Sequence, residues 1–338
     1  ELRGKTDLVR PSTTTTTTTP SPFAAAAKTA VLFLHGGANV HYSERSYRPL
    51  TTRLAALSGL PVIVPDYRLA PEHRYPAALE DALAVAEWAL ENFEDGLLLA
   101  GDSSGGGLAL ALAMKLEEKK GEGTLSTTTT TRPVRGILLL SPWLDATARG
   151  PSYRTRRWRG DDGGGGDPLY TAAEETTRAE TRALALKYWK TLDDPAVHPF
   201  YAPDSDLARL PETYLVVGDA EVLLDDARVF ARKASRAGAT VRLDVWPHLF
   251  HDFPMYSEGG GGILPPLPEA LVALRRAARW LQSRAATGEK KTTTTVLPKD
   301  LTLRKPPVVG DDDDDDPPRK KNMPTTKQTL PTRDESDY

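Results

Sequence analysis

The segment LLLAGDSSG, residues 97–105, decides the fold. Its apolar half, Leu97–Ala100, is typical of a buried strand, and its glycine-flanked serines lead directly into a long amphipathic stretch. A serine between such a strand and a helix lies in a strained turn that projects its hydroxyl above the sheet, where the helix N-terminus favours negative charge. A glycine-rich helix start without chemistry is one alternative. A phosphate-binding loop is another, but it would end in Gly-Lys-Ser/Thr, which is missing here. We therefore predict that Ser103 is a nucleophile.

On both sides of this segment, short apolar runs alternate with longer amphipathic stretches. Such alternation predicts an α/β fold, with a mostly parallel sheet and helices on both of its faces. The predicted strands are Val31–Leu34, Val62–Val64, Leu97–Ala100, Ile137–Leu140, Tyr214–Val217 and Val241–Trp246. The predicted helices are Pro49–Leu57, Ala77–Asn92, Ser104–Lys119, Val222–Ala237 and Pro268–Ser283.

The predicted domain covers residues 29–285. Residues 145–211 are too long for a simple crossover and contain an amphipathic stretch, Ala172–Lys190. We expect them to form a helical cap insertion over the carboxyl ends of the strands, where open α/β sheets bind ligands. Residues 1–28, with a threonine run, are expected to be a flexible arm, and residues 286–338 a disordered tail whose aspartate run is a solvated spacer.

The composition excludes several classes of function. A net charge of −3 gives no electrostatic reason to expect nucleic-acid binding. With no cysteine in 338 residues, disulfides, thiolate metal sites and cysteine nucleophiles are excluded, and a cytoplasmic location is expected. No apolar run approaches the roughly 20 residues that span a bilayer, so no transmembrane segment is predicted.

The loop after the first strand predicts an oxyanion hole. His35-Gly36-Gly37-Ala38 follows Val31–Leu34, and its small residues let the backbone present N–H groups to a substrate oxygen. We assign Gly36, Gly37, Ala38 and Ser104 to this hole, with Gly37, Ala38 and Ser104 as the N–H donors. An ordinary turn is the alternative, which the presence of the serine turn disfavours. His35 is expected to brace the loop.

The base and the acid should follow the nucleophile in the chain. His41 and His73 precede Ser103, whereas His251 comes just after the last strand, where the base belongs. The neighbouring His248 follows a proline and is interpreted as a loop residue. The acid should follow the strand Tyr214–Val217 and orient the imidazole. The candidates are Asp219, Glu221, Asp225 and Asp226, the last two also explicable as helix N-terminal or solvated charge. The local sequence leaves this choice open.

Six blocks of sequence, in order along residues 28–285, resemble the hormone-sensitive-lipase-like esterases, also called the alpha/beta hydrolase 3 family. They are HGGA at 35–38, DYRLAPE at 66–72, GDSSGG at 101–106, SPWLD at 141–145, GDAEVL at 218–223 and HDF at 251–253. The resemblance implies an α/β-hydrolase fold and a triad of Ser103, Glu221 and His251. It also implies an acyl-enzyme mechanism on small hydrophobic esters, without a metal or organic cofactor. Arg68 is expected to pair with a carboxylate beneath the site.

The chain departs from the family pattern at three places. Ala38 replaces a third glycine, His248 and Leu249 stand where small residues are common, and residues 1–28 lack the amphipathic helices of the usual lid.

Tyr42 and Trp143 are candidate pocket walls, with core packing as the alternative. An amidase or deacetylase would use the same triad. A non-catalytic small-molecule receptor on this scaffold would have lost the histidine that His251 supplies.

Overall fold

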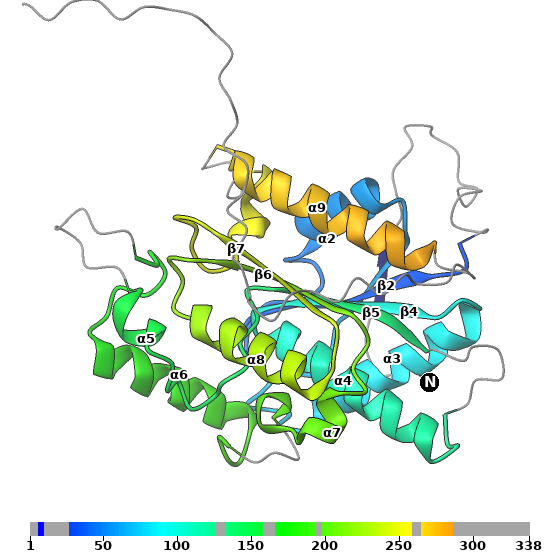
Figure 1. Ribbon diagram of the computed structural model, residues 1–338, viewed down its shortest axis with the longest axis horizontal. Coiled ribbons are helices and arrows are strands. Elements are labelled where there is room, and N and C mark those ends of the chain that lie inside the picture. Colours follow the sequence, from blue (N-terminus) through cyan, green and yellow to red (C-terminus); the bar gives the residue numbers. More distant parts are fainter. Residues whose placement is uncertain are drawn as a thin grey trace, which may run out of the picture. The chain divides into compact units, whose positions relative to one another are not determined.

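The structure is a computed structural model that describes residues 6–9, 27–125, 133–157, 166–193, 198–258 and 265–286. Its centre is a seven-stranded sheet in the order β1-β3-β2-β4-β5-β6-β7 (Figure 1). The strands are β1 (Thr6–Val9), β2 (Ala30–Leu34), β3 (Val62–Pro65), β4 (Leu97–Asp102), β5 (Val134–Leu140), β6 (Thr213–Gly218) and β7 (Val241–Trp246). Strands β2 to β7 pair in parallel, which confirms the predicted α/β fold and all of its predicted strands.

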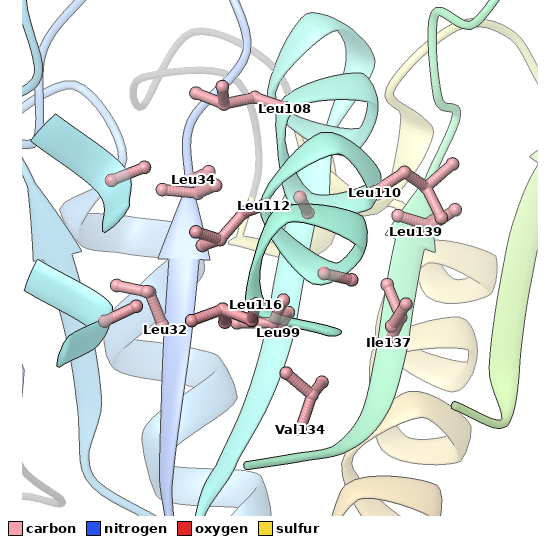
Figure 2. Close-up of a cluster of buried hydrophobic side chains, with 14 of the residues drawn as sticks. Leu32, Leu34, Leu99, Leu108, Leu110, Leu112, Leu116, Val134, Ile137 and Leu139 are labelled. Atoms are coloured by element: carbon pink, nitrogen blue, oxygen red, sulfur yellow. The ribbon is translucent and has the colours of Figure 1, made fainter. Parts of the chain in front are cut away.

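The central strands are apolar on both faces because both faces are covered by helices. Side chains alternate between two core clusters along each strand. Leu32, Leu34, Leu97 and Leu99 belong to one cluster, and Val31, Phe33, Leu98 and Ala100 to the other. Figure 2 shows the first cluster, in which Leu112 and Leu116 of the helix after β4 pack onto strand leucines.

The helices divide between the two faces of the sheet (Figure 1). The first cluster is covered by α3 (Ala77–Asn92), α4 (Ser103–Gly121) and α8 (Leu224–Ala237). The second is covered by α2 (Arg48–Ser58) and α9 (Pro268–Ala285), which follows the 3-10 helix η2 (Phe253–Glu258). The core between these layers holds the carboxyl ends of β4, β6 and β7 in place, and the catalytic candidates follow these ends.

The chain between β5 and β6 contains the helices α5 (Ser152–Thr155), α6 (Glu174–Tyr188) and α7 (Asp204–Leu207), with the 3-10 helix η1 (Pro199–Tyr201). Tyr188 at the end of α6 is buried in the same cluster as α3 and α4. In the part of the chain that the structure describes, no helix has both the length and the apolar character needed to cross a bilayer.

Part of the expected N-terminal arm is a strand instead. β1 pairs antiparallel with β3, with Thr6 opposite Pro65 and Val9 opposite Val62. The expectation of a flexible arm is wrong for this strand, since a strand of 4 residues next to a threonine run leaves no alternation to detect. Most of the remaining arm, the tail from residue 287 and its aspartate run lie outside the described residues.

Candidate active site

The turn between β4 and α4 has the strained backbone that the sequence predicted. Ser103 has a φ of 47°, in the left-handed region that side chains disfavour. Two residues later, a Cβ on Gly105 would lie 2.1 Å from the carbonyl oxygen of Leu34. Only glycine fits at that position, because α4 starts directly against the end of β2. The local sequence thus lifts the Ser103 hydroxyl above the sheet edge.

His251 reaches this hydroxyl from the loop after β7. Its Nε2 lies 3.1 Å from the Ser103 Oγ, although 148 positions separate the two residues in the chain. His251 is only 6% exposed, so bulk water does not compete for its ring. A neutral ring with its proton on Nδ1 presents a lone pair to the serine hydroxyl, as a general base must.

Glu221 is the one acid candidate that meets the base. Its Oε2 accepts the Nδ1–H of His251 at 3.0 Å, and its Oε1 accepts the N–H of Gly218 at 2.6 Å and the hydroxyl of Ser141 at 3.1 Å. The other three candidates have different partners. Asp219 accepts from His248 N–H, Asp225 from Ser152 N–H, and Asp226 from Leu144 and Asp145 N–H. Asp226 is fully buried, so its interpretation as a solvated charge is wrong.

Burial and neighbouring charge shift the pKa values of this pair. Burial raises the pKa of Glu221 to about 7, although its contact with His251 acts in the opposite direction. For His251, burial disfavours the cation, yet its pKa is raised well above the usual value because Asp252, Tyr170 and Glu221 favour the charged ring. Because His251 acts as a base only when it is neutral, its raised pKa moves the onset of activity to higher pH.

The oxyanion loop is fixed to the nucleophile turn by Asp102 and Ser104. The buried Asp102 accepts the N–H of Gly36 at 2.9 Å and the hydroxyl of Tyr47 at 2.7 Å, while the Ser104 hydroxyl accepts the N–H of Asn39 at 3.1 Å. The Gly36 N–H therefore points to Asp102 and does not face the substrate, so our inclusion of Gly36 in the hole needs correction. Burial, with the neighbouring Asp252, raises the pKa of Asp102 well above its ordinary value.

Gly37, Ala38 and Ser104 remain the candidate donors. Gly37 has a φ of 109°, and a Cβ there would lie 2.3 Å from the carbonyl oxygen of His41, so the loop requires glycine at this position. Ala38, which stands at the position of the family's third glycine, has a φ of 58°. His35 braces the loop as expected, because its buried ring stacks on Tyr67 with centroids 4.3 Å apart.

Two carboxylates near the base escaped the sequence analysis. Asp252 places its Oδ2 3.1 Å from the His251 Nε2, the same nitrogen that faces Ser103. Asp167, in the insertion, accepts the N–H of His251 at 3.3 Å and that of Val222 at 3.4 Å. Asp252 lies inside a quoted motif and could have been suspected. Asp167 follows a glycine run and has no local signal.

Arg68 lies outside the site, as the resemblance implied. Its guanidinium contacts Asp81 at 2.9 Å and Glu80 at 3.0 Å on α3.

Within the described ranges, no cluster of three or more His, Asp or Glu side chains has the arrangement of a metal site.

A cleft of about 370 Å³ lies above the nucleophile. Ser103, Ala38 and Trp143 line it together with residues of the insertion, among them Tyr170 and Leu184. Tyr42 has a different position: it is 61% exposed and packs edge-on against Tyr47. Of the two aromatic candidates, Trp143 therefore lines the cleft and Tyr42 lies at the surface.

Known proteins share this fold and this sequence pattern. The family described as alpha/beta hydrolase fold matches residues 31–255. An acetyl-hydrolase of Streptomyces hygroscopicus is 34% identical over 262 residues, which cover 77% of this chain and 76% of that protein. An esterase of Acinetobacter venetianus is 32% identical over 270 residues, covering 77% of each chain. The crystal structure of an esterase from the bacterial hormone-sensitive lipase family aligns with a TM-score of 0.63 at 31% identity, covering 78% of this chain and 79% of that one. The chain belongs to the alpha/beta hydrolase family, in its hormone-sensitive-lipase-like esterase branch.

Proposed function

We propose that the protein is a serine carboxylester hydrolase in which Ser103, His251 and Glu221 form the catalytic triad. The observation that carries the proposal is the continuous chain of contacts from the Ser103 Oγ through the imidazole to the Glu221 carboxylate, at 3.1 and 3.0 Å. The family membership of the chain and the names of its relatives, which include an acetyl-hydrolase and two esterases, support ester hydrolysis.

The geometry supports acyl transfer in two steps. The Ser103 Oγ attacks the ester carbonyl while its proton passes to the His251 Nε2, and the N–H groups of Gly37, Ala38 and Ser104 stabilise the oxyanion. The imidazolium then returns the proton to the departing alcohol, which leaves an acyl group on Ser103. His251 then takes a proton from a water molecule, which attacks the acyl group, and the imidazolium returns that proton to the Ser103 Oγ as the acid leaves. Glu221 holds the Nδ1 proton throughout and so fixes the tautomer that both steps need.

Small esters are the proposed substrates. The cleft of about 370 Å³ lies at the lower end of the volumes of ligand pockets, and its walls combine apolar side chains with the polar nucleophile. The predicted cytoplasmic location remains a prediction from the cysteine-free composition.

Covalent labelling tests the assignment. We expect a fluorophosphonate to label the purified protein and p-nitrophenyl acetate to be hydrolysed, because both reactions use the same activated serine. Ser103→Ala should abolish both, whereas Ser205→Ala, at an exposed position on α7, should leave both unchanged. Labelling that persists in Ser103→Ala contradicts the nucleophile. A folded protein with neither labelling nor turnover would indicate a non-catalytic receptor. The contact between His251 and Ser103 argues against that alternative.

A further inference from the structure

Trp143 lines both the catalytic cleft and a second, apolar cavity. The second cavity lies between α4 and the insertion, and Leu108, Ala111, Tyr188 and Trp189 contribute to its lining. Its free volume is only about 20 Å³, which is space for about one water molecule. In its present form this cavity has no room for a substrate chain.

The apolar cavity borders a larger groove as well as the cleft. The groove has a volume of about 920 Å³, and Tyr75, Leu79, Ala111, His198 and Pro199 line both the groove and the cavity. Three spaces therefore follow one another from Ser103 outward: the cleft, the apolar cavity and the groove.

Trp143 is held firmly at the first of these boundaries. Its backbone N–H donates to the carbonyl oxygen of Ser103 at 2.8 Å, and its Nε1–H donates to the carbonyl oxygen of Asp145 at 3.3 Å. Its ring packs edge-on against Trp189 with centroids 5.7 Å apart, and the residue is 6% exposed. Contacts at the backbone, the indole nitrogen and the ring surface keep the indole from swinging aside.

The position of the catalytic base indicates which part of the ester faces Trp143. The departing alcohol must lie beside the His251 Nε2, which gives it a proton. Tyr170, which lines the cleft, packs edge-on against His251 with centroids 6.1 Å apart. The acyl group extends from the carbonyl carbon in another direction, and the apolar cavity that shares Trp143 with the cleft is the space we assign to it.

We propose that Trp143 determines the acyl-chain specificity by closing the acyl end of the cleft, so that the enzyme accepts short acyl chains and excludes those of about eight carbons. The apolar cavity and the groove behind it form the path that a longer chain takes when the indole is removed. This inference rests on the proposed ester hydrolysis at Ser103.

The test compares kcat/KM for p-nitrophenyl acetate and p-nitrophenyl octanoate. In Trp143→Ala, the ratio of octanoate to acetate should rise at least about tenfold, because each methylene that enters an apolar pocket contributes to the specificity. Trp88→Ala is the matched control, since it removes a tryptophan that is 38% exposed on α3. Its ratio should equal that of the unchanged protein.

A second pair of variants tests the route. Ala111→Leu fills the apolar cavity from α4, so adding it to Trp143→Ala should bring the ratio back toward its original value. Trp143→Phe keeps an aromatic ring in the core and should raise the ratio by a smaller factor. It serves as the test if Trp143→Ala does not fold, as judged by thermal melting.

The outcomes separate this inference from the proposed function. A protein that hydrolyses neither ester overturns the function itself. Hydrolysis of the acetate with an unchanged ratio in Trp143→Ala, or in Trp143→Phe if that variant alone folds, overturns the role of Trp143. A raised ratio that Ala111→Leu does not reduce overturns the route through the apolar cavity.

Discussion

Replacing Glu221 by glutamine should invert the tautomer of the catalytic base. The backbone N–H of Gly218 lies 2.6 Å from the Glu221 Oε1 and can only donate, so the amide oxygen of the glutamine must take that position. The amide NH₂ then takes the position of Oε2, 3.0 Å from the His251 Nδ1. Nδ1 can no longer donate there, and its proton moves to Nε2. The ring then presents an N–H, instead of a lone pair, to Ser103.

The size of the loss follows from this geometry. A triad with the wrong tautomer loses about 10⁴-fold in kcat, which corresponds to about 5.4 kcal/mol at about 1.36 kcal/mol for each factor of ten. The glutamine cannot escape by rotating its amide. Rotation would set NH₂ against the Gly218 N–H and leave a buried donor unsatisfied, at a cost of about 1–3 kcal/mol.

The assay is the kcat for p-nitrophenyl acetate at pH 8, with thermal melting to show that the variant is folded. Asp225→Asn is the matched control, because the Asp225 carboxylate accepts a backbone N–H from Ser152 and an amide oxygen can replace it. Its kcat should stay within about threefold, as expected for a retained hydrogen bond outside the site. The reasoning is refuted if Glu221→Gln keeps more than about a tenth of the activity, or if Asp225→Asn loses as much.

Three further predictions concern pH and packing. Asp252→Asn should move the acid limb of the kcat/KM profile to lower pH, because Asp252 favours the charged form of His251 and the base acts only when neutral; an unmoved limb contradicts this. Folding raises the pKa of Glu221 to about 7, so the contribution of this group to stability is present below about pH 4.5 and is lost as the pH rises through 7. The melting temperature of the original protein should therefore fall from pH 5 to pH 8 more steeply than that of Glu221→Gln. Equal slopes would exclude the effect. Gly105→Ala should lower the melting temperature strongly, since its Cβ meets a β2 carbonyl at 2.1 Å, whereas Gly121→Ala, with nothing within 4 Å, should not; similar melting temperatures would show that the turn can relax.

The sequence predicted the features that short segments determine. The strands of the parallel sheet are continuous apolar runs, and the Ser103 turn and the position of His251 follow from residues next to a strand end. The choice of Glu221 needed the family resemblance, because four carboxylates lie within residues 219–226 and each is plausible locally. Their hydrogen-bond partners come from other parts of the chain.

The remaining features depend on distant contacts. The Gly36 N–H is lost to the oxyanion hole because Asp102, 66 positions away, accepts it. Asp167 reaches the N–H of His251 across 84 positions, from a segment whose sequence shows only a glycine run and a turn. The strand β1 gains its order by pairing with β3, and its own residues carry no alternation long enough to reveal it. Local periodicity contains no information about such partners.

The hydrogen bond between Asp167 and the backbone of His251 links the insertion's wall of the cleft to the loop that carries the base. Asp167 immediately precedes residues 168–172, several of which line the cleft. It accepts the backbone N–H of His251 and that of Val222, the residue after Glu221. An ester with a bulky alcohol that pushes this wall outward should also loosen the hydrogen bond that Asp167 accepts from the backbone N–H of His251. Such esters should therefore bind and yet turn over slowly, so that discrimination against them is expressed in kcat more than in KM.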